Sequence, residues 1–315
     1  MMKMIWSFCI GLTGFFFLHN AWATPLFVED FSTGTGKGAL ENIEIKDGKA
    51  GLKICNLINN GSFEVSDKGE IPGFYLYDGT KGALDTATTH DGKNSVLIVK
   101  PTGLYLHPTN SAAVREGVGK YLVSVWVKTG FGPTPDENAV QMRAVGFDAE
   151  KKTRTQVIGA YLAGTHDWTR LVQPVVPDKN TAFIGFDIKP RIKNPEETGC
   201  RLWIDGVQIE EGKRPSAFTE KYYREGLYTS LEIPLAAGSG QIALKTVIPT
   251  GTGVEARWRA AKDTAGLETA TWSEWNAANP IAFTAKNMKI LQLQVRLLSM
   301  DRGLETPLIS SIVVE

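Results

Sequence analysis

The sequence predicts an all-β protein built from two β-sandwiches. Runs of strand-like length recur along the chain, and Gly, Pro, Asp or Asn lie in or beside the connections between them. The clearest runs between residues 57 and 220 are residues 95–99, 121–128, 140–147, 156–162 and 181–188. No segment keeps a sustained 3.6-residue apolar period, so long helices are not expected. A chain of 315 residues is long enough for two domains, each with its own core.

The N-terminus has the pattern of a secretory signal peptide over residues 1–23. Lys3 supplies a short positive region, residues 5–18 are apolar, and Ala21-Trp22-Ala23 offers a small-x-small cleavage site. A membrane anchor would need about 20 apolar residues, and this run is shorter. We therefore predict a secreted or periplasmic protein with no membrane span after signal removal.

The charge of the whole chain is balanced, with 34 Lys+Arg and 34 Asp+Glu. A partner held by bulk electrostatics, such as nucleic acid or an anionic membrane surface, is therefore not expected. The same balance gives no reason to expect a strongly acidic ligand.

Two distant segments carry the most informative motifs. Residues 56–64 read N-L-I-N-N-G-S-F-E, and residues 203–212 read W-I-D-G-V-Q-I-E-E-G. They resemble the first and last strands of the carbohydrate-binding modules of the family four/nine type, which are galactose-binding-like jelly rolls. The resemblance extends to residues 71–74 (I-P-G-F), 91–97 (D-G-K-N-S-V-L), 121–128 (Y-L-V-S-V-W-V-K) and 167–170 (D-W-T-R). It implies a jelly roll over residues 55–220 that binds a polysaccharide or another glycan.

The sequence departs from that family at two positions. Phe74 stands where the family usually has Trp, and Gly206 replaces the second Asp of the usual closing motif. The first change puts a phenyl ring in place of the usual indole, which bears on sugar affinity, and the second removes one possible calcium ligand.

Residues 221–315 resemble a small β-sandwich that recurs in secreted bacterial proteins. Its motifs are a G-x-Y-x-S opening at residues 226–230, a P-x-G-T-x-V strand near 249–254, a W-x-x-W turn at 272–275, and a closing strand over 294–308. The aromatic and basic residues Trp272, Trp275, Arg257, Arg259 and Arg296 fit a structural Trp–Arg ladder, with a binding role as the alternative.

Residues 25–54 look like one or two strands joined by a turn. They are too short to stand alone, because an isolated hairpin is marginal in water. In proteins with the second kind of sandwich, a similar strand directly precedes the G-x-Y-x-S segment. We therefore expect residues 25–54 to pair with the C-terminal sandwich, so that the jelly roll is inserted into it. An independent N-terminal extension packing on the jelly roll is the alternative.

The predicted mature chain keeps two cysteines, because Cys9 lies in the signal. Export permits a disulfide between Cys55 and Cys200. An antiparallel register between residues 60–64 and 203–207 would separate the two sulfurs beyond disulfide reach. A bridge and two buried thiols both remain open at this point.

Sugar recognition needs a flat aromatic face together with fixed hydrogen-bonding groups. Alternation along the predicted strands places a set of such residues away from the apolar face. This mixed face would carry Trp126, Gln141, Arg143 and Asp187. The alternative is that Trp126 is buried under a loop and that the charged residues form solvated pairs.

Aromatic residues in loops are the other candidates for ligand binding. Tyr75 and Tyr77 alternate on one side of a short run and would rim a groove, and Tyr105, His107 and Tyr161 are the remaining candidates. Each is also explained as a single exposed aromatic of a β-sandwich loop.

The jelly-roll resemblance also implies a structural calcium ion where the first and last strands meet. Glu64 and Asp205 would contribute carboxylate oxygens, and backbone carbonyls would complete the shell of oxygens that Ca²⁺ requires. The alternative is that both residues cap strand ends.

No catalytic residue is predicted, because four His residues give no metal-ligand spacing and neither a G-x-S-x-G elbow nor a P-loop is present. The sequence therefore indicates a secreted, non-catalytic carbohydrate-binding protein. Two alternatives remain: a surface-assembly or protein-interaction module without sugar binding, and an accessory part of a glycoside hydrolase system.

Overall fold

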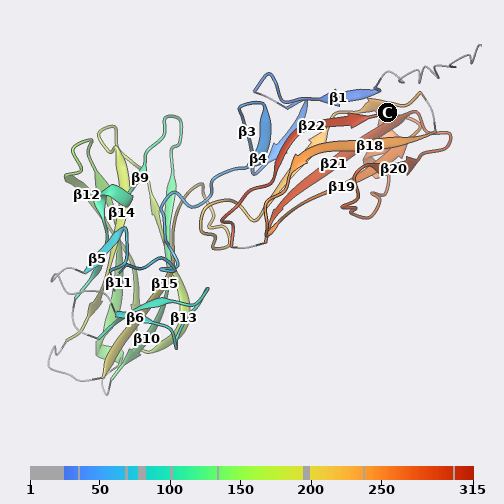
Figure 1. Cartoon of the computed structure of the whole chain (residues 1–315). Helices are drawn as coiled ribbons and strands as arrows, with labels where there is room; N and C mark the ends of the chain where they lie inside the picture. Colours follow the sequence, from blue (N-terminus) through green and yellow to red (C-terminus); the bar gives the residue numbers. More distant parts are fainter. Residues whose placement is uncertain are drawn as a thin grey trace, which may run out of the picture.

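The protein is an all-β molecule with two lobes, as the sequence predicts (Figure 1). The computed structural model describes residues 25–34, 36–67, 70–76, 83–99, 102–132, 135–193, 199–236, 238–300 and 302–315, without the side chains of 155–158. The predicted signal peptide and Tyr77 lie outside these residues.

The first lobe is a sandwich of two antiparallel sheets in the middle of the chain. One sheet has the order β13 (His166–Val175), β10 (Tyr121–Phe131), β15 (Cys200–Glu211), β7 (Ser95–Ile98) and β6 (Ala83–Asp85). The other has the order β12 (Thr153–Ala163), β11 (Ala139–Phe147), β14 (Phe183–Arg191), β8 (Leu104–Leu106) and β5 (Phe74–Leu76), with β9 (Ala112–Ala113) paired to β14. Among the described residues of this lobe, two short 3-10 helices lie in connections, η1 (Pro108–Asn110) and η2 (Pro135–Glu137). We call this lobe the jelly roll.

Alternation along the strands builds the core of the jelly roll. Val123, Val125 and Val127 of β10 point inward, and Val140 and Met142 of β11 face them from the other sheet; all five are fully buried. The opposite faces of the two sheets are therefore left for polar and aromatic side chains. The predicted alternation of β10, β11 and β14 is confirmed.

The second lobe is a sandwich assembled from both ends of the described chain. One sheet contains β20 (Ile281–Thr284), β18 (Ser239–Val247), β22 (Leu308–Val314), β4 (Lys49–Leu52), β3 (Ile43–Lys46) and β1 (Phe27–Glu29). The other contains β17 (Ile233–Pro234), β21 (Ile290–Ser299), β16 (Glu225–Ser230), β2 (Gly38–Glu41) and β19 (Thr252–Ala261). The single α-helix of the described residues is α1 (Thr264–Thr269). We call this lobe the C-terminal sandwich.

The N-terminal strands pair with strands from the other end of the chain. In β1, Phe27 lies opposite Val314 of β22, and in β2, Leu40 lies opposite Tyr228 of β16. Strand β4 also pairs with β22. Figure 1 shows the blue strands β1, β3 and β4 beside the red strand β22. The jelly roll thus lies between two pieces of a discontinuous C-terminal sandwich.

A Trp–Arg ladder covers one side of the C-terminal sandwich, which confirms the predicted stacking. The Arg257 guanidinium lies 5.0 Å from the Trp272 ring and 4.3 Å from the Trp275 ring. Arg259 adds to Trp272 at 4.6 Å, and Arg296 adds to Trp275 at 4.5 Å. Each cation thus lies at cation–π distance from a ring.

The segment expected to form the first jelly-roll strand, residues 56–64, forms no regular strand. Its ends still follow the last strand in an antiparallel direction, because the Leu57 amide donates to the Ile209 carbonyl and the Val207 amide donates to the Gly61 carbonyl. Asn60 and Phe63 adopt φ values of 58° and 60°, which lie outside the β region and interrupt the strand.

Cys55 and Cys200 are both buried and are not joined to each other. Burial raises the pKa of the Cys55 thiol to about 12. The Cys55 Sγ lies 3.2 Å from the Ser216 Oγ. The sequence left open a disulfide or two buried thiols, and the structure contains the two buried thiols.

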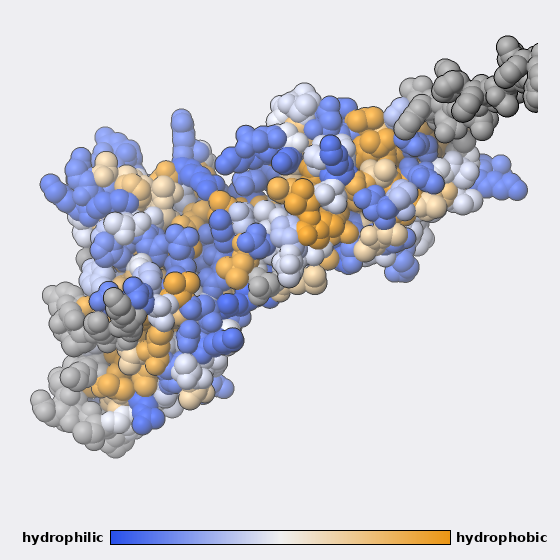
Figure 2. Space-filling model, viewed as in Figure 1, coloured by the Kyte–Doolittle hydropathy of each residue, from blue (hydrophilic) through white to orange (hydrophobic). Residues whose placement is uncertain are grey.

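The visible surface of both lobes carries many hydrophilic residues with smaller hydrophobic areas between them (Figure 2). Large exposed apolar side chains occur in both lobes, for example Val176 in the jelly roll and Leu231 in the C-terminal sandwich. In the part of the chain that the structure describes, no helix is long and apolar enough to cross a membrane.

Candidate functional site: a groove on the jelly roll

Four of the predicted ligand-binding residues form one row across neighbouring strands. Arg143 of β11 lies opposite Asp187 of β14, Asp187 lies opposite Tyr105 of β8, and Tyr105 lies opposite Tyr75 of β5. Directly opposite residues project from the same face of a sheet. Because neighbouring strands are about 4.8 Å apart, the row extends over about 14 Å.

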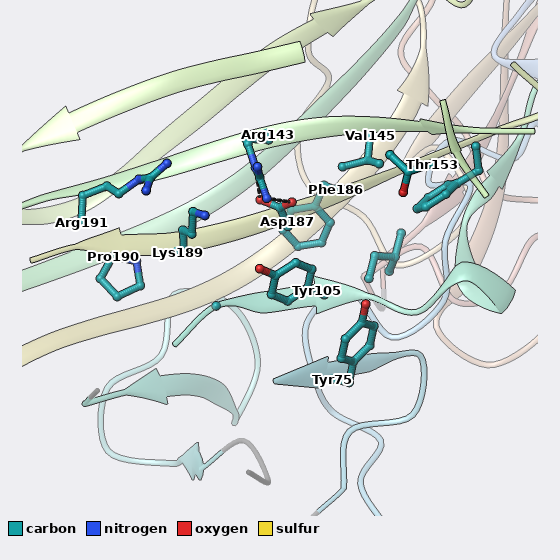
Figure 3. A pocket seen from close by; sticks show the side chains of 13 residues that line it. Tyr75, Tyr105, Arg143, Val145, Thr153, Phe186, Asp187, Lys189, Pro190 and Arg191 are labelled. Atoms are coloured by element: carbon teal, nitrogen blue, oxygen red, sulfur yellow. Dashed lines mark hydrogen bonds and ion pairs between the residues drawn. The ribbon is translucent and has the colours of Figure 1, made fainter. Parts of the chain in front are cut away.

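This row lies in a groove of about 510 Å³ on the outer face of the sheet (Figure 3). Its remaining lining residues are Gly103, Leu106, Val145, Phe147, Thr153, Phe186, Lys189, Pro190 and Arg191. The volume falls in the range of small-molecule sites, roughly 300–1,000 Å³.

Two tyrosines form the aromatic end of the groove. The rings of Tyr75 and Tyr105 are stacked, with centroids 5.3 Å apart and an interplanar angle of 18°, and His107 contacts Tyr75 edge-on. Tyr75 is 44% exposed, so part of its ring is open to a ligand. Burial, followed by the Asp187 carboxylate, raises the pKa of Tyr75, which keeps its hydroxyl protonated and able to donate.

Gly103 allows the aromatic and basic residues to approach each other. A Cβ at this position would lie 2.9 Å from the Tyr105 ring and 3.2 Å from the Lys189 Cβ. Any larger residue would displace one of them. The glycine therefore helps to set the shape of the groove floor.

An arginine–carboxylate pair holds the centre of the groove. Arg143 donates to both Asp187 oxygens, from Nε at 2.7 Å and from Nη2 at 2.5 Å. This hydrogen bonding raises the pKa of Arg143. Asp187 is 2% exposed, and bidentate pairing fixes the orientation of both groups. The pair presents preorganised polar atoms beside the tyrosines.

A second row lies next to the first on the same face. Gln141 of β11 lies opposite Tyr161 of β12 and opposite Lys189 of β14. The Gln141 Oε1 accepts hydrogen bonds from Arg191, at 3.0 Å from Nε and 2.6 Å from Nη2. Tyr161 is 60% exposed and stands beside the groove rather than in its lining.

The expectation that Trp126 shares this face is wrong. Trp126 belongs to β10, which is in the other sheet of the jelly roll. Its ring stacks on His90, with centroids 3.9 Å apart, and a Cβ on Gly206 would lie 2.9 Å from its Cδ1. Alternation within one strand sorts residues by face but cannot tell which of two sheets contains the strand. The alternative, Trp126 covered by a loop, describes its surroundings better.

Glu64 and Asp205 lie around one loop at the junction of the two lobes. The Asp205 Oδ2 accepts from the amides of His90 and Asp91 at 2.8 and 2.9 Å. The Glu64 Oε1 accepts from the amides of Lys93 and Asn94 at 2.7 and 3.0 Å, in an arrangement of the kind that caps a loop.

An arginine of the C-terminal sandwich reaches into this junction. The Arg302 Nη1 lies 3.7 Å from Glu64, 3.8 Å from Asp91 and 3.6 Å from Glu220, and it donates to the Ser62 Oγ at 3.1 Å. The Arg302 carbonyl accepts from the Glu220 amide at 2.8 Å. A guanidinium from one lobe thus meets three carboxylates of the other lobe and its exit segment.

This junction does not fit the calcium ion implied by the jelly-roll resemblance. Backbone amides already use both Asp205 oxygens and the Glu64 Oε1, and the Arg302 guanidinium supplies a positive charge beside Glu64. Among the described residues, no group of three or more His, Cys, Asp or Glu side chains is placed to hold a metal ion. Calcium therefore stays a prediction from the sequence.

Sequence reasoning missed Arg191, Gly103 and Arg302. Arg191 carried a usable signal, because it continues the alternation of Asp187 and Lys189 along one strand. Gly103 lies in a short loop without any motif. Arg302 is distant in sequence from every carboxylate in the jelly roll, so only the fold brings them together.

Comparison with known proteins gives similar solved structures. No protein-family model and no curated protein matches the chain. The CBM22-1 xylan-binding domain of Paenibacillus barcinonensis Xyn10C is 17% identical, with 49% of this chain and 94% of that chain covered and a TM-score of 0.37. The CBM22-1–CBM22-2 tandem domain of the same protein is 11% identical, with 81% and 95% covered and a TM-score of 0.36.

A third similar structure is TmCBM61 in complex with β-1,4-galactotriose. It is 18% identical, covers 50% of this chain and 99% of that chain, and has a TM-score of 0.34. These structures are carbohydrate-binding modules of families 22 and 61, not of the family four/nine type that the motifs resemble. Likenesses this slight carry no argument about the ligand, so the function has to be argued from the groove.

Proposed function

We propose that this protein binds a polysaccharide or another glycan through the groove on the jelly roll. The observation that carries the proposal is the cross-strand row in which the stacked Tyr75 and Tyr105 stand next to the Arg143–Asp187 pair. A pyranose ring has an apolar side that packs on an aromatic face and hydroxyl groups that need fixed partners. The row offers both within one groove.

Each part of the row has a distinct task in this proposal. The exposed part of Tyr75 packs against a sugar ring, and Tyr105 supports it from behind. Asp187 accepts from sugar hydroxyls, while Arg143 donates to them. Because the Arg143–Asp187 pair is held by two hydrogen bonds, little side-chain entropy is lost on binding.

The proposal assigns binding, not catalysis, to this chain. It also includes export, on the basis of the signal pattern in residues 1–23. Packing on one or two sugar rings with a few hydrogen bonds corresponds to dissociation constants of roughly micromolar to millimolar. Binding this weak suits a module that acts on a polymer with many repeated sites.

The test is affinity electrophoresis of the mature chain in gels that contain xylan, β-1,4-galactan or polygalacturonate, followed by calorimetry on the polymer that retards it most. Replacing Tyr75→Ala should weaken binding about ten-fold, which corresponds to ~1.4 kcal/mol. Tyr75 is exposed, so we expect the stability of the variant to remain within about 0.5 kcal/mol of wild type.

Trp168→Ala is the matched control. Trp168 is an aromatic residue of β13, in the other sheet, where its ring contacts His90 edge-on at 5.6 Å. We expect this variant to bind as wild type does. If Trp168→Ala loses binding and Tyr75→Ala keeps it, the ligand site lies on the Trp126 side and the groove proposal is wrong.

A further inference from the structure

The groove has an excess of positive charge that the composition of the whole chain conceals. Three basic side chains, Arg143, Lys189 and Arg191, line it together with a single carboxylate, Asp187. The formal excess is therefore two positive charges in one concave site. A cleft lined by one sign of charge concentrates its field and attracts ligands of the opposite sign.

Two of these cations have no carboxylate partner among the residues that the structure describes. Arg143 uses its charge on Asp187. Arg191 donates only to the neutral Gln141 amide oxygen, and no described acidic group pairs with the Lys189 ammonium. Burial, followed by the charges of Arg143 and Arg191, lowers the pKa of Lys189. An anion at this end of the groove would relieve that repulsion.

The basic and aromatic groups occupy different ends of the groove. Lys189 and Arg191 follow Asp187 at intervals of two along β14, so all three project from the same face. Figure 3 shows Lys189 and Arg191 on one side of the Arg143–Asp187 pair and Tyr75 on the other. A bound chain would therefore meet an aromatic surface at one end and a cationic surface at the other.

We propose that the groove selects an acidic glycan, with a carboxylate or sulfate group of one sugar bound between Lys189 and Arg191 while a neighbouring sugar ring packs on Tyr75. The inference rests on the proposed glycan-binding function and names its ligand class. Arg191 approaches the anion with its planar guanidinium, and Lys189 with a rotatable ammonium. Asp187 is held by Arg143 and so adds little repulsion.

The experiment compares polygalacturonate with its carboxyl-reduced form, which keeps the polymer backbone and lacks the charge. Dextran sulfate is a third probe, which separates a sulfate from a carboxylate. Xylan and β-1,4-galactan serve as neutral polymers. We expect wild type to bind at least one of the two charged polymers about ten-fold more tightly than any neutral one. That preference should shrink as salt is raised, because partly exposed ionic contacts are screened.

The decisive variant is Lys189→Gln combined with Arg191→Gln. It should reduce the ratio of charged-polymer affinity to neutral-polymer affinity about ten-fold, because it removes the two cations that would bind the anion. Its control is Lys262→Gln with Lys286→Gln, which removes the same charge from exposed positions of the C-terminal sandwich. We expect the control to bind every polymer as wild type does.

The outcomes separate the two proposals. Equal affinity of wild type for charged and neutral polymers, or binding to neutral polymers alone, would overturn the acidic-ligand inference and leave glycan binding intact. A loss of the same size in both double variants would also overturn it, because the attraction would then come from net charge alone. If no polymer retards the protein, the proposed function itself fails.

Discussion

The groove and the junction each place an arginine among carboxylates, and they differ in which charge is in excess. In the groove, Arg143 meets one carboxylate and two more cations stand nearby. At the junction, Arg302 meets three carboxylates and no second cation is paired there in the described structure. The two arginine side chains are similarly exposed, at 17% and 23%. A chain of zero net charge thus holds two local imbalances of opposite sign.

This difference determines what each local excess of charge can do. Excess charge in an open groove remains accessible to a ligand, so it can contribute to binding. Excess charge in a packed contact cannot reach an outside partner, so its desolvation lowers the stability of the folded protein. Burial accordingly raises the pKa of Glu220 to about 7, even though Arg302 lies 3.6 Å away. Burial likewise raises the pKa of Asp205 to about 7.

The largest effect that tests this comparison is expected from Arg302→Ala. Removing the guanidinium leaves Glu64, Asp91 and Glu220 close together without a counter-charge, and breaking a largely buried pair in this way costs about 3 kcal/mol. We expect urea unfolding, followed by tryptophan fluorescence, to show this loss. Because Arg302 links the two lobes, the variant should also unfold in two separated steps. Adding Glu220→Gln should restore part of the stability by removing one of the repelling charges.

The matched control is Arg296→Ala. Arg296 pairs with Glu255 at 2.5 Å and lies over Trp275, but all three groups belong to the C-terminal sandwich and only one carboxylate is involved. Its loss should cost about 1 kcal/mol. Equal losses of unfolding free energy in Arg302→Ala and Arg296→Ala would contradict the expectation that the three carboxylates make the junction more sensitive to the loss of its arginine.

A smaller effect is expected in the pH dependence of stability. A carboxyl group whose pKa is raised in the folded state binds protons more tightly there, so its stabilising contribution is complete below its unfolded pKa of about 4.5 and is lost as the pH rises through about 7. Glu220→Gln removes the pH dependence that Glu220 contributes and leaves the one that Asp205 contributes. The free energy of unfolding of the variant should fall less than that of wild type between pH of about 5 and about 8, by on the order of 2 kcal/mol.

The urea m-value serves as the control for that measurement, since an unchanged value shows that the variant exposes the same surface on unfolding. Parallel curves for wild type and variant across this pH range would mean that Glu220 is not held in an uncompensated site. The comparison between the groove and the junction would then lose its energetic basis.

Much of the groove could be predicted from the sequence, because it depends on local patterns. Period-two alternation places Gln141 and Arg143 on one face of β11 and Asp187 on one face of β14, and these strands are neighbours. The same rule could not place Trp126, since membership of a sheet is decided by long-range pairing. It also misjudged residues 56–64, where positive φ values at Asn60 and Phe63 interrupt a segment with a strand-like motif.

The charge imbalances could not be predicted from composition. The excess in the groove depends on Lys189 and Arg191 projecting beside Arg143, and the excess at the junction depends on a loop after β21 meeting the first segment of the jelly roll. Both require the register and docking of distant strands. A whole-chain charge of zero says nothing about either one.

The smallest effect is expected when calcium is added or removed. This measurement distinguishes the calcium site that the family resemblance implies from a junction in which Arg302 supplies the positive charge. If Arg302 supplies the positive charge at the junction, excess Ca²⁺ or a chelator should leave the melting temperature of wild type within about 1 °C, because a ligand stabilises only when the folded state binds it. In Arg302→Ala, Glu64, Asp91 and Glu220 are released from the guanidinium. Carboxylate oxygens are the ligands that Ca²⁺ prefers, so this variant should be stabilised by excess Ca²⁺ and not by Na⁺ at equal ionic strength. A calcium-dependent rise in wild type would instead show that the ion binds beside Arg302, and the calcium site implied by the family resemblance would stand.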